Sequence, residues 1–242
     1  MADRVTYQLD TNHPAPIATI TMDDGKANVM SPGMQAEINA ALDRAEADGA
    51  VVVLAGRENR FSAGFDLGIL QAGTSETLDM LLGGFKLAHR VLSFDTPVVI
   101  ACTGHAIAMG VFLLLSGDYT VGAEGPYKIV ANEVAIGLTM PHTAVEVCRQ
   151  RLTPAHFNRA VLLSEQYSPE TAIAAGFLDA VVAPDQVVAT AQAKAAEFAQ
   201  LNLRAHAASK RRSRGPALAA ISAAIEADAA DLQAMAASAA TT

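Results

Sequence analysis

Tryptophan is absent from this sequence of 242 residues, aromatic residues make up only 5% of it, and there are only two cysteines. Cys102 and Cys148 stand in apolar surroundings, far from any spacing typical of metal ligands. Two such cysteines exclude the disulfide framework of a small secreted domain and a cysteine-based zinc site. We therefore expect two buried, reduced thiols.

Charged side chains are also scarce. They make up 17% of the chain, and the formal net charge is −8. A nucleic-acid-binding protein needs a basic surface to meet the phosphate backbone, so we expect no nucleic acid partner. Hydrophobic residues, in contrast, reach 51%. This content excludes disorder along most of the chain and is sufficient for one large core.

Long hydrophobic runs are missing as well. The stretch AIAMGVFLLL at 106–115 is about half of the roughly 20 residues that a membrane span needs. The N-terminal MADRVTYQLD lacks the basic-then-apolar pattern of a secretory signal. We expect a cytoplasmic protein without a membrane partner.

Several well-known functional motifs do not occur. The sequence contains no G-x-G-x-x-G after a strand, no P-loop and no G-x-S-x-G nucleophile elbow. His142 and Glu146 lie four positions apart on a predicted helix, but no third ligand accompanies them. We therefore predict no metal site and no bound cofactor.

Strand and helix patterns alternate along the chain and predict an α/β fold. Ser31 followed by Pro32 is typical of a helix start. Residues 17–24 alternate apolar with polar and predict a half-exposed strand, whereas 50–56 and 96–104 predict strands buried on both faces. Further strands are predicted at 118–123, 127–130 and 178–183, and further helices at 75–92, 108–116, 141–152, 153–164, 168–176 and 184–202.

The chain divides by character near residue 190. Residues 1–190 are predicted to form the core with the active site, and residues 191–242 a helical region. From about residue 216 alanine dominates, with only weak amphipathic spacing. Such a helix has little core of its own, so we expect it to pack on the main body or on a neighbouring subunit.

Two predicted strands end in glycine and small residues, at FSAGFDL (61–67) and at TGHAIAMG (103–110). Backbone N–H groups at a strand end or a helix start have no partner in the regular structure. Two such groups that converge can stabilise a negatively charged oxygen. The alternative is that glycine and alanine here only permit tight packing.

A basic cluster, SKRRSR at 209–214, contrasts with the acidic chain. It predicts either a solvated helix end or a phosphate site, because lysine and arginine both bind phosphate oxygens.

The motifs together resemble one family. FSAGFDL is similar to the F-x-A-G-A-D-L stretch of the enoyl-CoA hydratase/isomerase (crotonase) superfamily, and TGHAIAMGVFLLLSGDYTVGAE (103–124) to its N-G-x-A-x-G-G-G-x-E-L-x-x-x-C-D-x-x-x-A. KANVMSPGM (26–34) resembles its early N-A-L-S-x-x-M, and NEVAIGLTMP (132–141) its P-E-x-x-x-G-x-x-P. The order and the spacing agree along nearly the whole chain.

The resemblance implies a crotonase-like spiral of ββα turns with a helical C-terminal oligomerisation region, assembled as a homotrimer or a dimer of trimers. It implies an acyl-CoA thioester as substrate, and an oxyanion hole formed by the backbone amides of Phe65 and Met109. The family usually has small residues at both positions, so these larger side chains are expected to narrow the acyl pocket. Implied substrate contacts lie at Ala63, Asp66, Leu67, Gly110, Phe112, Lys26 and Lys210.

The two glutamates of the family's hydratases are not both present. Phe112 stands at the first position, and Glu133 matches the second. One carboxylate beside an oxyanion hole suffices for a 1,3-proton shift. The resemblance therefore implies a Δ3,Δ2-enoyl-CoA isomerase, in which the apolar neighbours of Glu133 raise its pKa.

Three alternatives remain at this point. The protein is a hydratase that recruits His105, His142 or Tyr119 for the missing role, or it binds acyl-CoA without catalysis. Alternatively, Glu133 only caps the turn that follows it.

The basic cluster gains a role from the resemblance. Lys210 matches a family lysine that approaches the CoA phosphates, with Arg211 or Arg212 assisting. Gly68 stands where many relatives carry another lysine. Asp118 matches a family aspartate and is expected to be structural.

Overall fold

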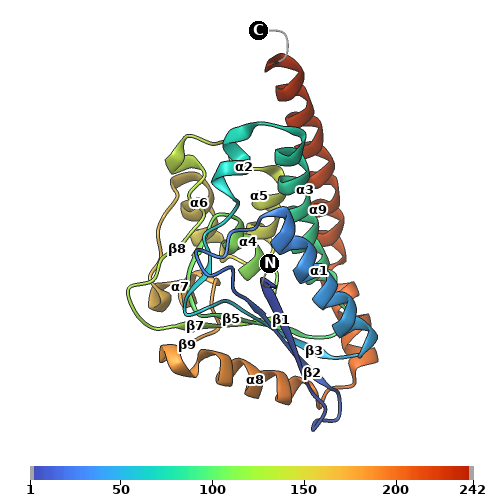
Figure 1. Ribbon diagram of the computed structural model, residues 1–242. Helices are drawn as coiled ribbons and strands as arrows, with labels where there is room; N and C mark the ends of the chain where they lie inside the picture. Colours follow the sequence, from blue (N-terminus) through green and yellow to red (C-terminus); the bar gives the residue numbers. More distant parts are fainter. Residues whose placement is uncertain (1–2, 240–242) are drawn as a thin grey trace.

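Within residues 3–239, which the computed structural model describes, six strands form the main sheet (Figure 1). Their order is β1-β2-β3-β5-β7-β9; β1 is antiparallel to β2, and the other pairs are parallel. The strands are β1 (Val5–Asp10), β2 (Ile17–Met22), β3 (Val51–Ala55), β5 (Val98–Cys102), β7 (Tyr119–Ala123) and β9 (Ala180–Val182).

Both faces of this sheet are covered, which explains its continuous apolar strands. Along β3, Val52 and Leu54 enter the larger core, beneath α1 (Pro32–Ala47) and α3 (Ser75–Ser93). The alternate residues of β3 enter a smaller core beneath α8 (Val187–Phe198). Figure 1 shows α8 below the sheet and α1, α3, α4 and α5 above it.

A three-stranded parallel sheet in the described chain lies beside the main one, in the order β4-β6-β8. Its strands are β4 (Asn59–Ser62), β6 (Gly104–Ile107) and β8 (Ile129–Val130). All three run in the same direction, so their carboxyl ends share one edge. This edge positions the candidate site.

The predicted helix start at Ser31 is confirmed. The Ser31 side chain accepts a hydrogen bond from Met34 N at 3.3 Å, and Pro32 is the first residue of α1. The prediction of a half-exposed strand at 17–24 is wrong. β2 is buried at nearly every position, because it pairs with β1 and β3 and its two faces meet the two cores.

The C-terminal region is helical, as predicted. α9 (Leu203–Ala239) packs on α3 and on α5 (His142–Arg149) of the same chain, and it continues through Pro216. Figure 1 shows its last turns extending past the other helices. The predicted division at residue 190 falls inside α8 and stays a prediction; of the two predicted parts, residues 1–2 and 240–242 lie outside the described residues.

The remaining elements are α2 (Leu67–Ala72), α4 (Met109–Leu114), η1 (Val134–Ile136), α6 (Pro154–Leu163), α7 (Pro169–Ala175) and η2 (Pro184–Gln186). The predicted α/β fold with a helical C-terminal region is confirmed. Among the described helices, none has both the length and the apolar character that crossing a membrane requires.

Candidate active site

Three predicted site residues follow the three strands of the smaller sheet. Phe65 comes shortly after β4, Met109 is separated from β6 by Ala108 alone, and Glu133 comes shortly after β8. Because these strands are parallel neighbours, the segments after them meet at one edge, which is where α/β proteins commonly place ligands. Positions far apart in sequence are therefore brought together.

The turn after β4 touches the turn after β6 so closely that only glycine fits. Gly64 has a φ of +91°, and a Cβ built on it would lie 2.9 Å from Ala108 Cβ and 3.5 Å from Met109 N. Ala108 itself has a φ of +50°, which is uncommon for a residue with a side chain. The glycine-rich motifs thus permit tight packing, and that packing also sets two backbone segments side by side.

One amide in each of these two segments has no acceptor among the described residues. Neither the N–H of Phe65 nor that of Met109 donates a hydrogen bond within the described part of the chain. Met109 is the first residue of α4, and the first N–H groups of a helix lack partners inside it. Both groups are therefore available to an oxygen from outside the protein.

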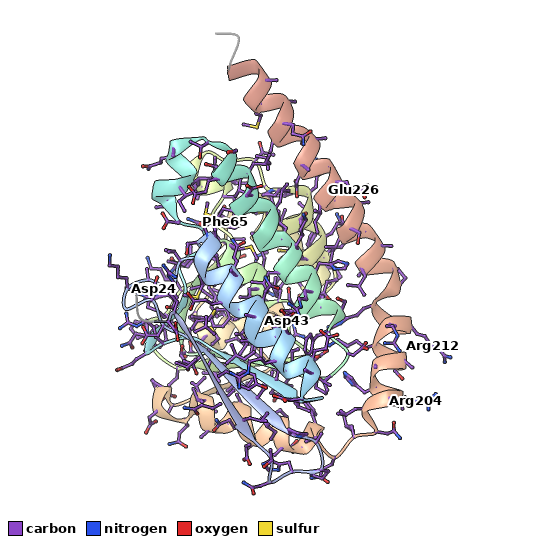
Figure 2. The ribbon with its side chains drawn as sticks, turned by 45° about the vertical axis from the view of Figure 1, so that its right-hand side comes forward. Asp24, Asp43, Phe65, Arg204, Arg212 and Glu226 are labelled. Carbon is purple, nitrogen blue, oxygen red and sulfur yellow. The ribbon has the colours of Figure 1, made fainter. Side chains whose placement is uncertain are left out.

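The side chains of Phe65 and Met109 pack against α3 at Gly84. A Cβ at Gly84 would lie 2.5 Å from Phe65 Cε1 and 3.3 Å from Met109 Sδ. The Phe65 ring also meets the Phe85 ring edge to face, with centroids 5.9 Å apart. Figure 2 shows Phe65 within the layer of helices above the sheet. Gly84 is what makes room for these two large side chains.

Glu133 is a buried carboxyl with an unpaired oxygen. Its exposed fraction is 7%, and Oε2 has no hydrogen-bond partner. Burial raises the pKa of Glu133 from its ordinary 4.5 to about 7. The backbone carbonyl of Glu133, and not its side chain, accepts from the N–H groups of Ile136 and Leu138. The alternative that the carboxylate caps the following turn is therefore wrong.

The α5 helix lies close to this carboxyl. Cys148 on α5 is fully buried, and burial followed by the charge of Glu133 raises the pKa of its thiol well above the usual range. The prediction of buried, free cysteines is confirmed for both Cys102 and Cys148. Cys148 is thus part of the apolar wall near Glu133.

Phe112 is 1% exposed and belongs to the larger core. A phenyl ring there transfers no proton. Gly110 packs so tightly on β4 that a Cβ would lie 2.6 Å from Ser62 O, and the N–H of Ala63 donates to Ala27 O at 3.0 Å. Gly110 thus joins the start of α4 to β4, and Ala63 joins the turn after β4 to the loop before α1.

A cleft of about 470 Å³ lies between the loop before α1 and the residues that follow the turn after β4. Asp66 and Lys26 contribute to it, as do Arg4, Asp24, Val29, Ser31, Pro32, Gly33, Ile69 and Glu76. Asp66 also caps α2 by accepting from Gly68 N at 2.9 Å, while Leu67 is 61% exposed. Asp66 follows Phe65 directly, so the cleft begins one residue from the free amide of Phe65, but Phe65, Met109 and Glu133 do not line it.

Lys210 does not lie where the resemblance implies. Its exposed fraction is 7%, and its Nζ is paired with Asp118 Oδ2 at 2.7 Å. A phosphate group in solvent cannot reach this ammonium while the pair is intact, so the structure contradicts the predicted phosphate contact. Arg211 pairs with Asp95, and Figure 2 shows Arg212 directed away from the body of the protein.

The candidates for a second acid or base are engaged elsewhere. His105 accepts from Lys128 N at 3.0 Å and packs on Tyr127. The Tyr119 ring packs against α8, and the exposed His142 side chain pairs with Asp231 at 3.3 Å. No group of three or more His, Cys, Asp or Glu side chains that could hold a metal ion occurs in the part of the chain that the structure describes.

Sequence reasoning missed three residues that support the site. The sequence does contain a signal for Gly84, because a Gly-Gly pair inside a predicted helix indicates close packing. Asn28 and Ser62 gave no such signal; Ser62 Oγ donates to Asn28 O at 2.7 Å, which ties the loop before α1 to the turn after β4.

Comparison with known proteins identifies a family and similar folds. Residues 12–241 match the family model described as enoyl-CoA hydratase/isomerase. A carnitinyl-CoA dehydratase of Salmonella typhi is 28% identical over 191 residues, which cover 78% of this chain and 73% of that protein.

Solved structures are similar over nearly the full length. A Mycobacterium tuberculosis structure described as an enoyl-CoA isomerase is 50% identical, with a TM-score of 0.90, and the match covers 95% of this chain and 99% of that chain. A second structure of the same Mycobacterium tuberculosis protein is described instead as a probable enoyl-CoA hydratase; it is 49% identical, with a TM-score of 0.91 and coverage of 96% and 97%. Human mitochondrial delta3-delta2-enoyl-CoA isomerase shares the fold at 24% identity, with a TM-score of 0.89 and coverage of 96% and 92%.

Proposed function

The chain belongs to the enoyl-CoA hydratase/isomerase family, and we propose that within it the protein is a Δ3,Δ2-enoyl-CoA isomerase with Glu133 as its only proton-transferring group. The observation that carries the proposal is the buried carboxyl of Glu133, whose Oε2 has no partner and whose pKa is raised to about 7. A carboxyl with this pKa exists in both forms at neutral pH, so it can take a proton and return it.

In the proposed reaction, the thioester oxygen accepts hydrogen bonds from the amides of Phe65 and Met109. Glu133 removes a proton from C2 of a 3-enoyl thioester, and the electrons delocalise into a dienolate with negative charge on that oxygen. The two amides stabilise this charge. The carboxyl then returns the proton to C4, which leaves the double bond between C2 and C3 with no atom gained or lost.

Hydration would require a second group to place or activate water. The buried phenyl ring of Phe112 stands at the position where the family's hydratases carry that group. His105, His142 and Tyr119 each have partners away from Glu133. These observations favour isomerisation over hydration.

The proposed substrate is an acyl-CoA thioester, which itself brings the CoA moiety, so the reaction needs no separate cofactor. The cleft lined by Asp66 begins one residue from the Phe65 amide, and the exposed Lys26 supplies a cation there for a phosphate group. The packing of Phe65 and Met109 on α3 supports a narrow acyl pocket.

We further propose a cytoplasmic homotrimer or dimer of trimers. Exposed apolar side chains support an interface; they occur at Val134, Ile136, Leu138, Leu162 and Leu163, with exposed fractions from 42% to 73%. Sedimentation velocity of the purified full chain tests the assembly, and a monomer at micromolar concentration contradicts it.

The activity is tested by supplying 3-enoyl-CoA and 2-enoyl-CoA separately. We expect isomerisation of the first, slow hydration of the second, and loss of isomerisation in Glu133→Ala. Rapid hydration of 2-enoyl-CoA that survives in Glu133→Ala overturns the proposal. Equal thioester affinity in both proteins, with no turnover of either substrate, favours a binding protein instead.

A further inference from the structure

The first turn of α5 is capped from a distant part of the chain. The residue before α5 is Pro141, and no side chain there accepts from the free amides. Asp228 on α9 does so instead, because its Oδ1 accepts from His142 N at 2.8 Å and its Oδ2 from Thr143 N at 2.9 Å. Asp228 is 5% exposed, and a carboxylate buried to this extent needs such partners.

The start of α5 is also the end of the segment that begins at Glu133. Residues 134–139 are exposed, and a hydrogen bond from Ala135 N to Ser164 Oγ, at 3.1 Å, tethers their middle. At the far end, Met140 is buried and Pro141 leads into the capped turn. Asp228 therefore fixes one of the two ends of the segment on which the position of Glu133 depends.

The α5 helix also contributes the wall near the carboxyl. Ala144, Val147 and Cys148 are fully buried on one side of it, and the thiol of Cys148 is within electrostatic reach of Glu133. A shift in the first turn of this short helix would move the wall and the segment together.

We propose that Asp228 is a positioning residue for Glu133 and acts through the first turn of α5. The inference rests on the proposed function, because it concerns how the proposed proton shuttle is placed. A misplacement of about 1 Å can cost on the order of 100-fold in rate. The turnover number should therefore respond to Asp228 while substrate affinity does not.

The test compares Asp228→Asn with Asp231→Asn in the full chain. Asp231 is the matched control, because it lies on the same helix and contacts the exposed side chain of His142 rather than buried amides. In Asp228→Asn we expect kcat for 3-enoyl-CoA to fall about 10- to 100-fold with KM nearly unchanged. In Asp231→Asn we expect neither to change. Wild-type kcat in Asp228→Asn overturns the inference.

A purely structural role for Asp228 is separated by a double-mutant cycle. If Asp228 acts through Glu133, Asp228→Asn has no further effect on the residual rate of Glu133→Gln. An equal fold-reduction in both backgrounds contradicts the proposal.

Two further arms make the test decisive. Should Asp228→Asn fail to fold, the added change Pro141→Ser supplies a local cap and is expected to restore folding and kcat; a failure to restore both overturns the inference.

Should the wild-type protein not isomerise 3-enoyl-CoA, the proposed function fails, and amide hydrogen exchange over residues 134–143 becomes the readout. Faster exchange in Asp228→Asn than in Asp231→Asn supports the inference, and equal exchange contradicts it.

Discussion

Asp118 and Glu133 are both largely buried carboxylates, but they lie in regions of opposite character. At the base of α9, Asp118 accepts from Val98 N at 2.7 Å and forms ion pairs with Lys210 and Arg214. At the edge of the three-stranded sheet, Glu133 Oε2 has no partner. The amides of Phe65 and Met109 near that edge also lack acceptors.

The difference shows how one chain uses buried polar groups for two purposes. Where each charge meets its opposite, the arrangement joins elements that are distant in sequence and leaves nothing free for a ligand. Where polar groups are buried without partners, the free energy of the folded state is higher. The carboxyl of Glu133 then remains available for proton transfer, and the N–H groups of Phe65 and Met109 remain available to a ligand. The first region is suited to structure and the second to chemistry.

The largest effect is expected from changing the unpaired carboxyl. Glu133→Gln preserves shape but cannot accept a proton, so kcat/KM for 3-enoyl-CoA should fall about 1,000-fold, while binding of a saturated acyl-CoA is retained. Steady-state kinetics and calorimetry measure the two quantities. Glu146→Gln serves as the control, because Glu146 lies on the nearby helix α5 but its carboxylate is paired with Arg149 near the surface. If Glu133→Gln kept kcat/KM within tenfold of the wild type, Glu133 would not be the proton-transferring group, and the two regions would not differ in function.

Breaking the paired region should instead cost stability. Asp118→Ala leaves the buried Lys210 and Arg214 without their acceptor, and the free energy of unfolding should fall by about 3–5 kcal/mol. Urea denaturation measures the change. Asp95→Ala, which removes only the exposed partner of Arg211, should cost less than about 1 kcal/mol. If both variants lost the same free energy of unfolding, burial of the Asp118 ion pairs would not contribute more to stability than an exposed pair does.

The unpaired carboxyl should make the protein less stable at high pH. Because the folded pKa of Glu133 is about 7 and the unfolded value 4.5, its contribution to stability is fully present below pH 4.5 and is lost as the pH rises through 7. Glu133→Gln does not ionise, so at pH 8 it should exceed the wild type by about 3 kcal/mol, with the gain vanishing near pH 4.5. Unfolding measured across this range checks the trend. A gain independent of pH would argue against it.

The smallest effect should come from moving an amide without touching the carboxyl. In Gly84→Ala the added methyl meets the Phe65 ring, and we expect kcat/KM to fall about tenfold, with a stability cost of about 1–3 kcal/mol. In the neighbouring Gly83→Ala the methyl meets Oε1 of the buried Gln35 instead. Because the Gln35 amide also donates to two backbone carbonyls, we expect a stability cost here as well, but activity should be kept because the Phe65 ring is not displaced. Identical kinetics in the two variants would show that the position of Phe65 does not affect the reaction.

The sequence predicted the elements of the site better than their partners. FSAGFDL and TGHAIAMG each break an apolar strand with glycine, and the structure brings Gly64 against Ala108 as that signal indicates. The raised pKa of Glu133 followed from its apolar neighbours. Each signal could be read within a few residues, as glycine at a strand end or as an acidic residue among apolar ones, although the segments that meet there are far apart in the sequence.

Lys210 shows where local pattern fails. Its basic neighbours suggested a solvated or phosphate-binding helix end, but the partner that buries it, Asp118, lies 92 residues away. Asp228 was equally hidden, since its acceptor role depends on α9 lying against α5. Long-range pairing of charges requires the tertiary arrangement, which neither composition nor spacing encodes.

The most direct test is a titration of the Glu133 carboxyl. Carbon-13 NMR of protein labelled at glutamate Cδ follows this group without any substrate, and the signal that is missing from Glu133→Gln identifies it. We expect a midpoint near pH 7, because the carboxyl is buried and its Oε2 has no partner. A midpoint near 4.5 would contradict it, because the carboxyl would then be paired or solvated and unsuited to carry a proton between two carbons.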